Sequence, residues 1–209
     1  MAASGRERAY QFLKDSYLSD PERQGGFINE QEVASLIGVS RTPIREALLL
    51  LSAEDLVQLI PKRGAYVAPM SGRELSELME MRGMVERHAA EQALRRGAAP
   101  VGPMEDALRH QEELTVPEEA RTFIDWDHRF HSALVASTGN DMLIKFYDGL
   151  RARQVRAGMV ALFSTQDRYA SVLDEHTVIL DALRSGHEAA AAAAIDSHLD
   201  ATLKVLLES

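Results

Sequence analysis

The chain has 209 residues, of which 45% are hydrophobic, so it can bury one large core or two modest ones. It contains no cysteine, which excludes disulfide bonds and thiolate metal sites and suits the cytoplasm. No apolar run approaches the roughly 20 residues that span a bilayer, and the N-terminus lacks the apolar core of a signal peptide. We therefore expect a cytoplasmic protein that does not bind membranes.

The formal net charge is −9, and it is distributed unevenly along the chain. Residues 1–70 carry a net charge of −1, whereas residues 71–209 carry −8. DNA binding requires a local basic face rather than a basic whole. The acidic total by itself argues against nucleic acid as a partner, but the first part could still present a basic face.

The first seventy residues predict short elements that are separated by turn signals. Apolar residues at helical spacing indicate a first helix over 7–18, and the Pro and Gly signals of 19–26 end it. Asn29 is a good N-cap for a second helix over 29–37, and Glu32 completes a capping-box pattern.

A third helix is predicted over 40–56, with Ser40 as its N-cap and Pro43 in the first turn, where proline is tolerated. Next, the β-rich runs "VQLI" and "AYVA" flank "PKRG" and indicate a hairpin. Two helices joined by the tight turn "GVS" and followed by a hairpin are typical of a winged helix-turn-helix. We therefore expect residues 1–69 to form a DNA-binding domain.

Residues 70–209 are expected to form a second, all-helical domain without strands. Six segments have helical period and propensity, namely 73–96, 103–114, 117–137, 140–164, 167–185 and 187–208. Gly, Pro or a "TGN" break separates most of them, which indicates an antiparallel bundle with short connections. The predicted fold class is thus mainly α, with an N-terminal winged helix-turn-helix and a C-terminal bundle.

The string "GVSRTPIREALLLLSAEDLVQLIPKRGAYV" strongly resembles the DNA-binding domain of GntR-family transcription regulators, and the resemblance covers about residues 6–68. It implies that the chain binds a double-stranded DNA operator. The residues that would contact DNA are those at the start of the third helix and at the wing tip: Ser40, Arg41, Thr42, Arg45, Lys62, Arg63 and Gly64.

Helix chemistry agrees with this implication. The N-terminus of a helix favours anions, and an arginine can bind guanine O6 and N7 with two hydrogen bonds. Glu46 is interpreted as orienting an arginine, because DNA would repel a free carboxylate. The alternative is that Arg41 and Arg45 only form a solvent-exposed helix surface. One departure is Gln31, where many relatives carry a basic residue, so one family contact with DNA is in question.

The second half resembles the FCD domain, the effector-binding bundle of FadR-type GntR regulators. The matching strings are "LMEMRGMVERHAAEQAL", "DHRFHSALVASTGN", "EHTVILDAL" and "AIDSHL". The resemblance implies a divalent metal site at Asp127, His131, His176 and His198. Three nitrogens and one oxygen suit Zn²⁺ first, and also Ni²⁺, Co²⁺, Mn²⁺ or Fe²⁺.

Spacing supports these four positions. Asp127 and His131 are four residues apart, so they share one helix face. His176 and His198 lie at similar distances on either side of the break near 185–186, so they would meet across a helical hairpin. The alternative is four ordinary interior polar residues that satisfy one another.

Arg82, in "MEMRGMVE", is implied by the same resemblance to face the cavity and to pair with a small carboxylate effector. The alternative is an ion pair with Glu86 within one helix.

The sequence therefore predicts a regulator and not an enzyme, with repression relieved by the effector as the commoner arrangement in the family. A homodimer that binds an inverted repeat is expected, because one winged helix makes few contacts. Two alternatives remain: a metal-dependent hydrolase with a DNA-binding appendage, which lacks an HExxH motif or an obvious general base here, and a regulator with a purely structural metal site.

Overall fold

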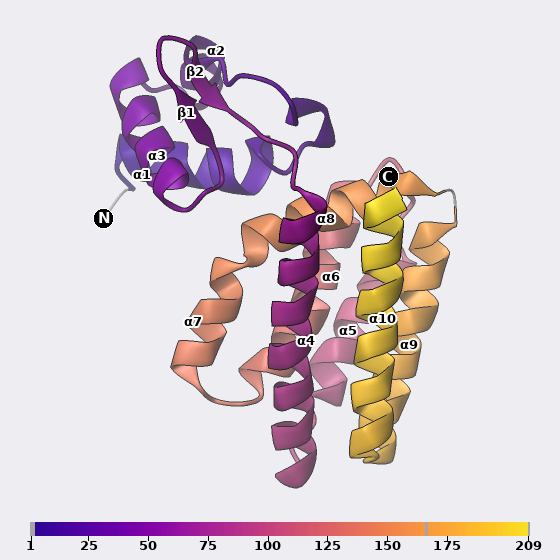
Figure 1. Ribbon diagram of the computed structural model, residues 1–209. Coiled ribbons are helices and arrows are strands. Elements are labelled where there is room, and N and C mark those ends of the chain that lie inside the picture. The colour runs from indigo at the N-terminus through magenta and orange to yellow at the C-terminus, as the bar shows by residue number, and fades with distance from the viewer. Residues whose placement is uncertain (1–2, 166, 209) are drawn as a thin grey trace. The chain divides into compact units, whose positions relative to one another are not determined.

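The computed structural model describes residues 3–165 and 167–208, which form two compact units (Figure 1). The first unit extends to Met70 and the second begins at Ser71. No helix within these residues is long and apolar enough to cross a membrane.

The first unit combines three α-helices with a two-stranded hairpin. Its elements are α1 (Gly5–Phe12), α2 (Glu30–Ile37), α3 (Arg41–Ala53), β1 (Gln58–Ile60) and β2 (Gly64–Tyr66), with a π-helical turn Leu13–Tyr17 after α1 and a 3₁₀ turn Pro21–Arg23. The strands pair antiparallel, with Leu59 opposite Ala65. Ile44 and Leu51 of α3 are completely buried, so α3 contributes its apolar face to the core and leaves its other face exposed.

The N-caps of α2 and α3 explain where these helices begin. Asn29 accepts hydrogen bonds from the backbone N–H groups of Gln31 and Glu32, as predicted. Glu32 was expected to complete a capping box, but its carboxylate lies 3.3 Å from Nη2 of Arg23 instead. Ser40 occupies the N-cap position of α3 without a side-chain hydrogen bond to the helix.

The second unit is a helical bundle, as the sequence predicts. Its described helices are α4 (Gly72–Arg95), α5 (Val101–Glu112), α6 (Ala120–Ala136), α7 (Asp141–Gly149), α8 (Arg151–Ser164), α9 (Arg168–Ser185) and α10 (Glu188–Glu208). Helix α10 packs on α4 and α9, and these three helices run side by side in Figure 1. Helix α6 packs on α4, α5 and α8, so its inner face looks into the middle of the bundle.

The single segment predicted over 140–164 is two helices in the structure. Asn140 caps α7 through the N–H groups of Met142 and Leu143, but the helix ends at Gly149. The N–H of Leu150 then bonds to the carbonyl of Tyr147 at 3.0 Å, which tightens the backbone before α8 begins. Glycine is a weak helix former, but Gly158 lies inside α8, so a glycine alone does not determine where the helix breaks.

Candidate functional site

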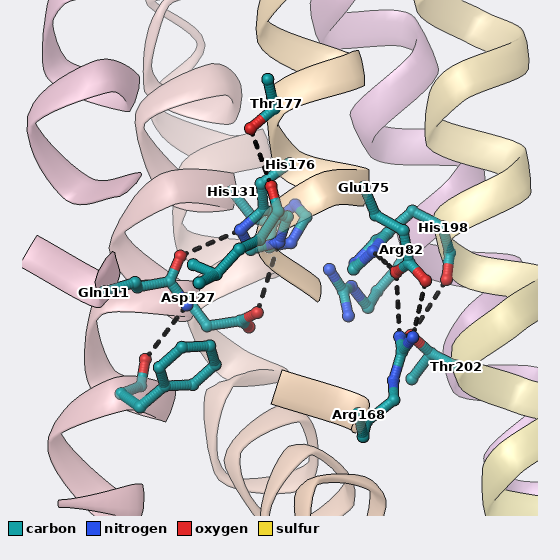
Figure 2. Close-up of polar contacts among 12 residues, drawn as sticks. Arg82, Gln111, Asp127, His131, Arg168, Glu175, His176, Thr177, His198 and Thr202 are labelled. Carbon is teal, nitrogen blue, oxygen red and sulfur yellow. Dashed lines mark hydrogen bonds and ion pairs between the residues drawn. The ribbon is translucent and has the colours of Figure 1, made fainter. Parts of the chain in front are cut away.

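Three histidines from three helices converge in the core of the bundle. His131 lies on α6, His176 on α9 and His198 on α10, and one ring nitrogen from each lies within 4.8 Å of the others. Each pair of ring centroids is 5.0 Å apart (Figure 2). All three side chains are buried.

Each histidine is oriented by a side-chain oxygen at its Nδ1 atom. The partners are Glu86 Oε2 for His131 at 2.8 Å, Gln111 Oε1 for His176 at 2.9 Å and Glu175 Oε2 for His198 at 2.7 Å. An ionised carboxylate only accepts hydrogen bonds, so the hydrogen bond to Glu175 places the proton of His198 on Nδ1. The contact of His131 with Glu86 is an ion-pair distance, and Glu86 Oε2 makes no hydrogen bond among the described residues. The Gln111 amide donates to the carbonyl of Phe123 at 3.4 Å, which directs its oxygen at His176.

With its proton on Nδ1, His198 has a free lone pair on Nε2. The Nε2 atoms of His131 and His176 are buried and have no hydrogen-bond partner among the described residues. Asp127 is not among the ligand atoms that lie within 4.8 Å of one another, but its Oδ1 lies 3.4 Å from His176 Nε2 and is a nearby acceptor (Figure 2). Acceptors that face one another without a donor are costly to bury, and a cation at their centre would satisfy them.

Burial also keeps His176 and His198 in the form that binds metals. The pKa of His176 is lowered well below its ordinary value, first by burial and then by the neighbouring histidines. Burial likewise lowers the pKa of His198, although the hydrogen bond to Glu175 opposes this change. Neutral imidazole is the form that donates a lone pair to a metal ion.

Arg82 makes the ion pair with Glu86 that the sequence left open, and it also lines the cavity. Its Nε atom donates to Glu86 Oε1 at 2.8 Å, so the ion pair within α4 exists. Arg82 nevertheless also lines the cavity beside Asp127 and His198, and its Nη2 atom has no hydrogen-bond partner among the described residues. Tyr147 donates its hydroxyl to the same Glu86 oxygen at 2.7 Å.

A second buried arginine, Arg168, lines the same cavity and was not predicted. It binds Glu175 through both terminal nitrogens, at 2.6 and 2.9 Å, and donates to Thr202 Oγ1 at 2.7 Å (Figure 2). The signal in the sequence is the seven-residue spacing from Arg168 to Glu175, which is two helical turns and places both on one face.

Two parallel chains of polar groups thus join the cavity to the histidines. The Arg82 chain runs from Arg82 through Glu86 to His131, and the Arg168 chain runs from Arg168 through Glu175 to His198. Burial alone would raise the pKa of each glutamate, but the surrounding arginine and histidine outweigh it and lower both.

The cavity itself is small, with a volume of about 30 Å³. A water molecule needs about 10–15 Å³ of such volume, so the cavity has room for roughly two. Its walls combine the polar side chains named above with apolar ones, among them Phe123, Ile124 and Leu162.

In the first unit, the residues implied to contact DNA are all exposed on α3 and the hairpin turn. Arg41 and Arg45 do not pair with Glu46, which was expected to orient one of them. Both bind Glu30 at the start of α2: Arg41 through Nε at 3.2 Å and Nη2 at 2.8 Å, and Arg45 through Nε at 2.8 Å.

At the tip of the hairpin, Lys62 and Gly64 have positive φ angles of 63° and 107°, and this left-handed backbone makes the tight turn. The guanidinium of Arg63 lies 4.6 Å from the centre of the Phe27 ring, a cation–π contact that holds this side chain against the unit.

Comparison with known proteins agrees with these two units. Residues 6–67 match the bacterial regulatory proteins of the gntR family, and residues 77–201 match the FCD domain. The chain belongs to the GntR family of transcriptional regulators, in the group with an FCD domain. It is therefore a DNA-binding transcriptional regulator of the GntR/FCD type.

Relatives and solved structures cover nearly the whole chain. An uncharacterised HTH-type transcriptional regulator of Streptomyces ambofaciens is 30% identical over 200 residues, which is 95% of this chain and 83% of the relative. The gluconate operon transcriptional repressor of Bacillus subtilis is 23% identical over 191 residues, 88% of this chain and 77% of the relative. A GntR regulator structure from Rhodococcus sp. RHA1 has a TM-score of 0.83 at 22% identity and covers 99% of both chains.

Proposed function

We propose that this GntR/FCD regulator holds one divalent metal ion on Asp127, His131, His176 and His198, and that a small carboxylate effector binds beside the ion to change operator binding. The observation that carries the proposal is the convergence of three buried histidine rings, two of which have an Nε2 atom without a hydrogen-bond partner among the described residues. Oriented Nδ1 partners of this kind accompany metal-binding histidines, because they fix the tautomer and raise the basicity of the ligand.

The donor set indicates which ions fit. Three imidazole nitrogens and one carboxylate oxygen suit Zn²⁺, with Ni²⁺, Co²⁺, Mn²⁺ and Fe²⁺ as the other candidates. A bound ion would supply a Lewis acid with coordination positions left for a carboxylate oxygen.

The charges around the cavity favour an anionic effector. Arg82 and Arg168 face the carboxylates of Glu86, Glu175 and Asp127, so the net charge is −1 before an ion binds and +1 with a divalent ion. One carboxylate group would neutralise the remaining charge, and a guanidinium binds such a group with two parallel hydrogen bonds.

The Arg82 and Arg168 chains would couple the effector to the metal. An effector carboxylate that takes hydrogen bonds from an arginine leaves the adjacent glutamate more free to bind the Nδ1–H of its histidine. A stronger hydrogen bond there makes the histidine a better ligand. Effector and metal should therefore increase each other's affinity, as thermodynamic linkage requires of any such coupling.

The relatives support a sugar acid or a similar small acid as effector, because one of them is the gluconate operon transcriptional repressor. On this basis we propose repression relieved by the effector. The operator contacts are proposed for Arg41 and Arg45 with the neighbouring Ser40 and Thr42, and for the wing residues Lys62, Arg63 and Gly64, in a homodimer on an inverted repeat.

Metal analysis tests the proposal. Protein purified without chelator should contain about one divalent metal ion per chain by mass spectrometry. His176→Ala should lower the metal content and abolish thermal stabilisation by a panel of carboxylates. Arg82→Ala should keep the metal and lose that stabilisation, with a lower melting temperature because Glu86 loses its buried cation.

Two results would contradict the proposal. A wild-type protein that takes up no added zinc, nickel or manganese would remove the metal site, and uptake undiminished in His176→Ala and His198→Ala would remove this choice of ligands. A metal-loaded protein whose operator affinity no carboxylate changes would support a purely structural site instead.

A further inference from the structure

Glu30 is an acidic residue beside the proposed DNA-reading residues Arg41 and Arg45. It is the first residue of α2, whose N-terminus favours a carboxylate, and its side chain is only 19% exposed. Burial would raise the pKa of Glu30, but the hydrogen bonds from Arg41 and Arg45 outweigh it and lower the pKa. Glu30 is therefore ionised at neutral pH, and its negative charge opposes DNA binding at this surface.

We infer that Glu30 is a positioning residue that fixes Arg41 and Arg45 for base recognition, and so sets operator specificity at the expense of DNA affinity. The inference rests on the DNA-binding function of the first unit. Oxygen Oε2 of Glu30 accepts from both arginines at once, so one carboxylate determines the directions of two long side chains.

The three contacts also divide the roles of the arginines. Arg45 is held through Nε alone, so both of its terminal amino groups are free of partners among the described residues. Those two groups are the ones that can bind O6 and N7 of a guanine together. Arg41 is held through Nε and Nη2, so fewer of its donors, the two N–H groups of Nη1 and the second N–H of Nη2, remain to contact a base or phosphate.

Removing the charge of Glu30 should have two opposite effects. The arginines become mobile and must be ordered when DNA binds, which weakens specific recognition. At the same time the surface loses a negative charge, which strengthens sequence-independent attraction to phosphates. If Glu30 only stabilises the N-terminus of α2, its removal would strengthen sequence-independent binding without weakening specific recognition.

The test compares Glu30→Gln with Glu32→Gln, a matched control on the same helix that also removes one charge and pairs with Arg23 instead. An operator selected from random duplexes with the wild-type protein, and a scrambled duplex of equal length, are titrated by fluorescence anisotropy. Glu30→Gln should bind the scrambled duplex a few-fold more tightly and lose about tenfold in the ratio of operator to scrambled affinity. Glu32→Gln should keep the wild-type ratio. Circular dichroism melts establish that both variants fold.

A second measurement separates positioning from a structural effect. Each operator base pair is substituted in turn, and the affinities are measured for Glu30→Gln, Arg41→Ala and Arg45→Ala. The base pairs whose substitution no longer changes the affinity of Glu30→Gln should be the same ones whose substitution no longer changes the affinity of the arginine variants. An unchanged affinity ratio in Glu30→Gln, an equal loss in Glu32→Gln, or insensitivity at unrelated positions overturns the inference. If Arg45→Ala also keeps the wild-type ratio of operator to scrambled affinity, the proposed operator contacts themselves are wrong.

Discussion

Glu86 is a completely buried carboxylate that Arg82, Tyr147 and His131 share. Glu86→Leu leaves Arg82 as a buried charge without a partner, and such losses cost about 3–5 kcal/mol of unfolding free energy. The double variant Arg82→Met/Glu86→Leu removes both charges, so it should recover about half of that loss even though Tyr147 and His131 remain without their partner. Urea unfolding followed by circular dichroism measures both values. A double variant that is less stable than Glu86→Leu would show that the pair does not act as a unit.

Because of its buried histidines, the metal-free protein should become less stable as the pH falls. The pKa values of His128, His176 and His198 are all lowered in the folded state, in each case first by burial. Below about pH 6.5 the unfolded chain binds protons that the folded chain does not, so the unfolding free energy falls as the pH falls. Each histidine contributes at most about 1.4 kcal/mol per pH unit.

Urea unfolding of chelator-treated protein between pH 7 and pH 5 tests this dependence. His198→Gln should make the decrease shallower, whereas His187→Gln, at an exposed position of the same unit, should leave it unchanged. A stability that rises toward pH 5 would be incompatible with histidines that are buried in the neutral form.

At the scale of elements, the sequence predicts the helices, caps and turns that depend on a local residue pattern. The Asn29 cap, the hairpin around 61–64 and the helical bundle follow from periodicity, capping and turn chemistry, and the structure contains them. The break after Gly149 was missed because helical propensity continues on both sides of it. A single glycine lowers helix stability, but packing decides whether the helix actually stops.

In the candidate site, too, local pattern predicts some features, whereas contacts between distant residues are visible only in the structure. The rise per residue of a helix predicts that His176 and His198 meet across the α9–α10 hairpin. The groups that orient them are distant in sequence, as with Gln111, which lies 65 residues from His176. Glu30 is likewise 15 residues from Arg45, whereas the expected partner Glu46 is adjacent to it. Such long-range pairs leave no periodic signal, so only the folded structure identifies them.

At the scale of the whole molecule, the expected assembly is a homodimer on an inverted repeat. A two-fold dimer places two recognition helices on half-sites related by the same symmetry, which doubles the contacts of one small winged helix. Light scattering should give the mass of two chains, both free and on a duplex that carries two half-sites. Shifting one half-site by about five base pairs should abolish the tight complex, because it moves that half-site to the other face of the DNA. A single chain on the full operator would contradict the dimer.

The size of the cavity has a consequence for the kinetics of effector binding. A space for about two water molecules is too small for a sugar acid or a dicarboxylate, and both arginines that line it are already paired. For the proposed effector to bind there, the walls must first open, and the rate of that opening does not depend on the effector concentration. As effector concentration rises, the observed association rate should level off at the opening rate, and variants that loosen the packing of α6 on α8 should raise that plateau.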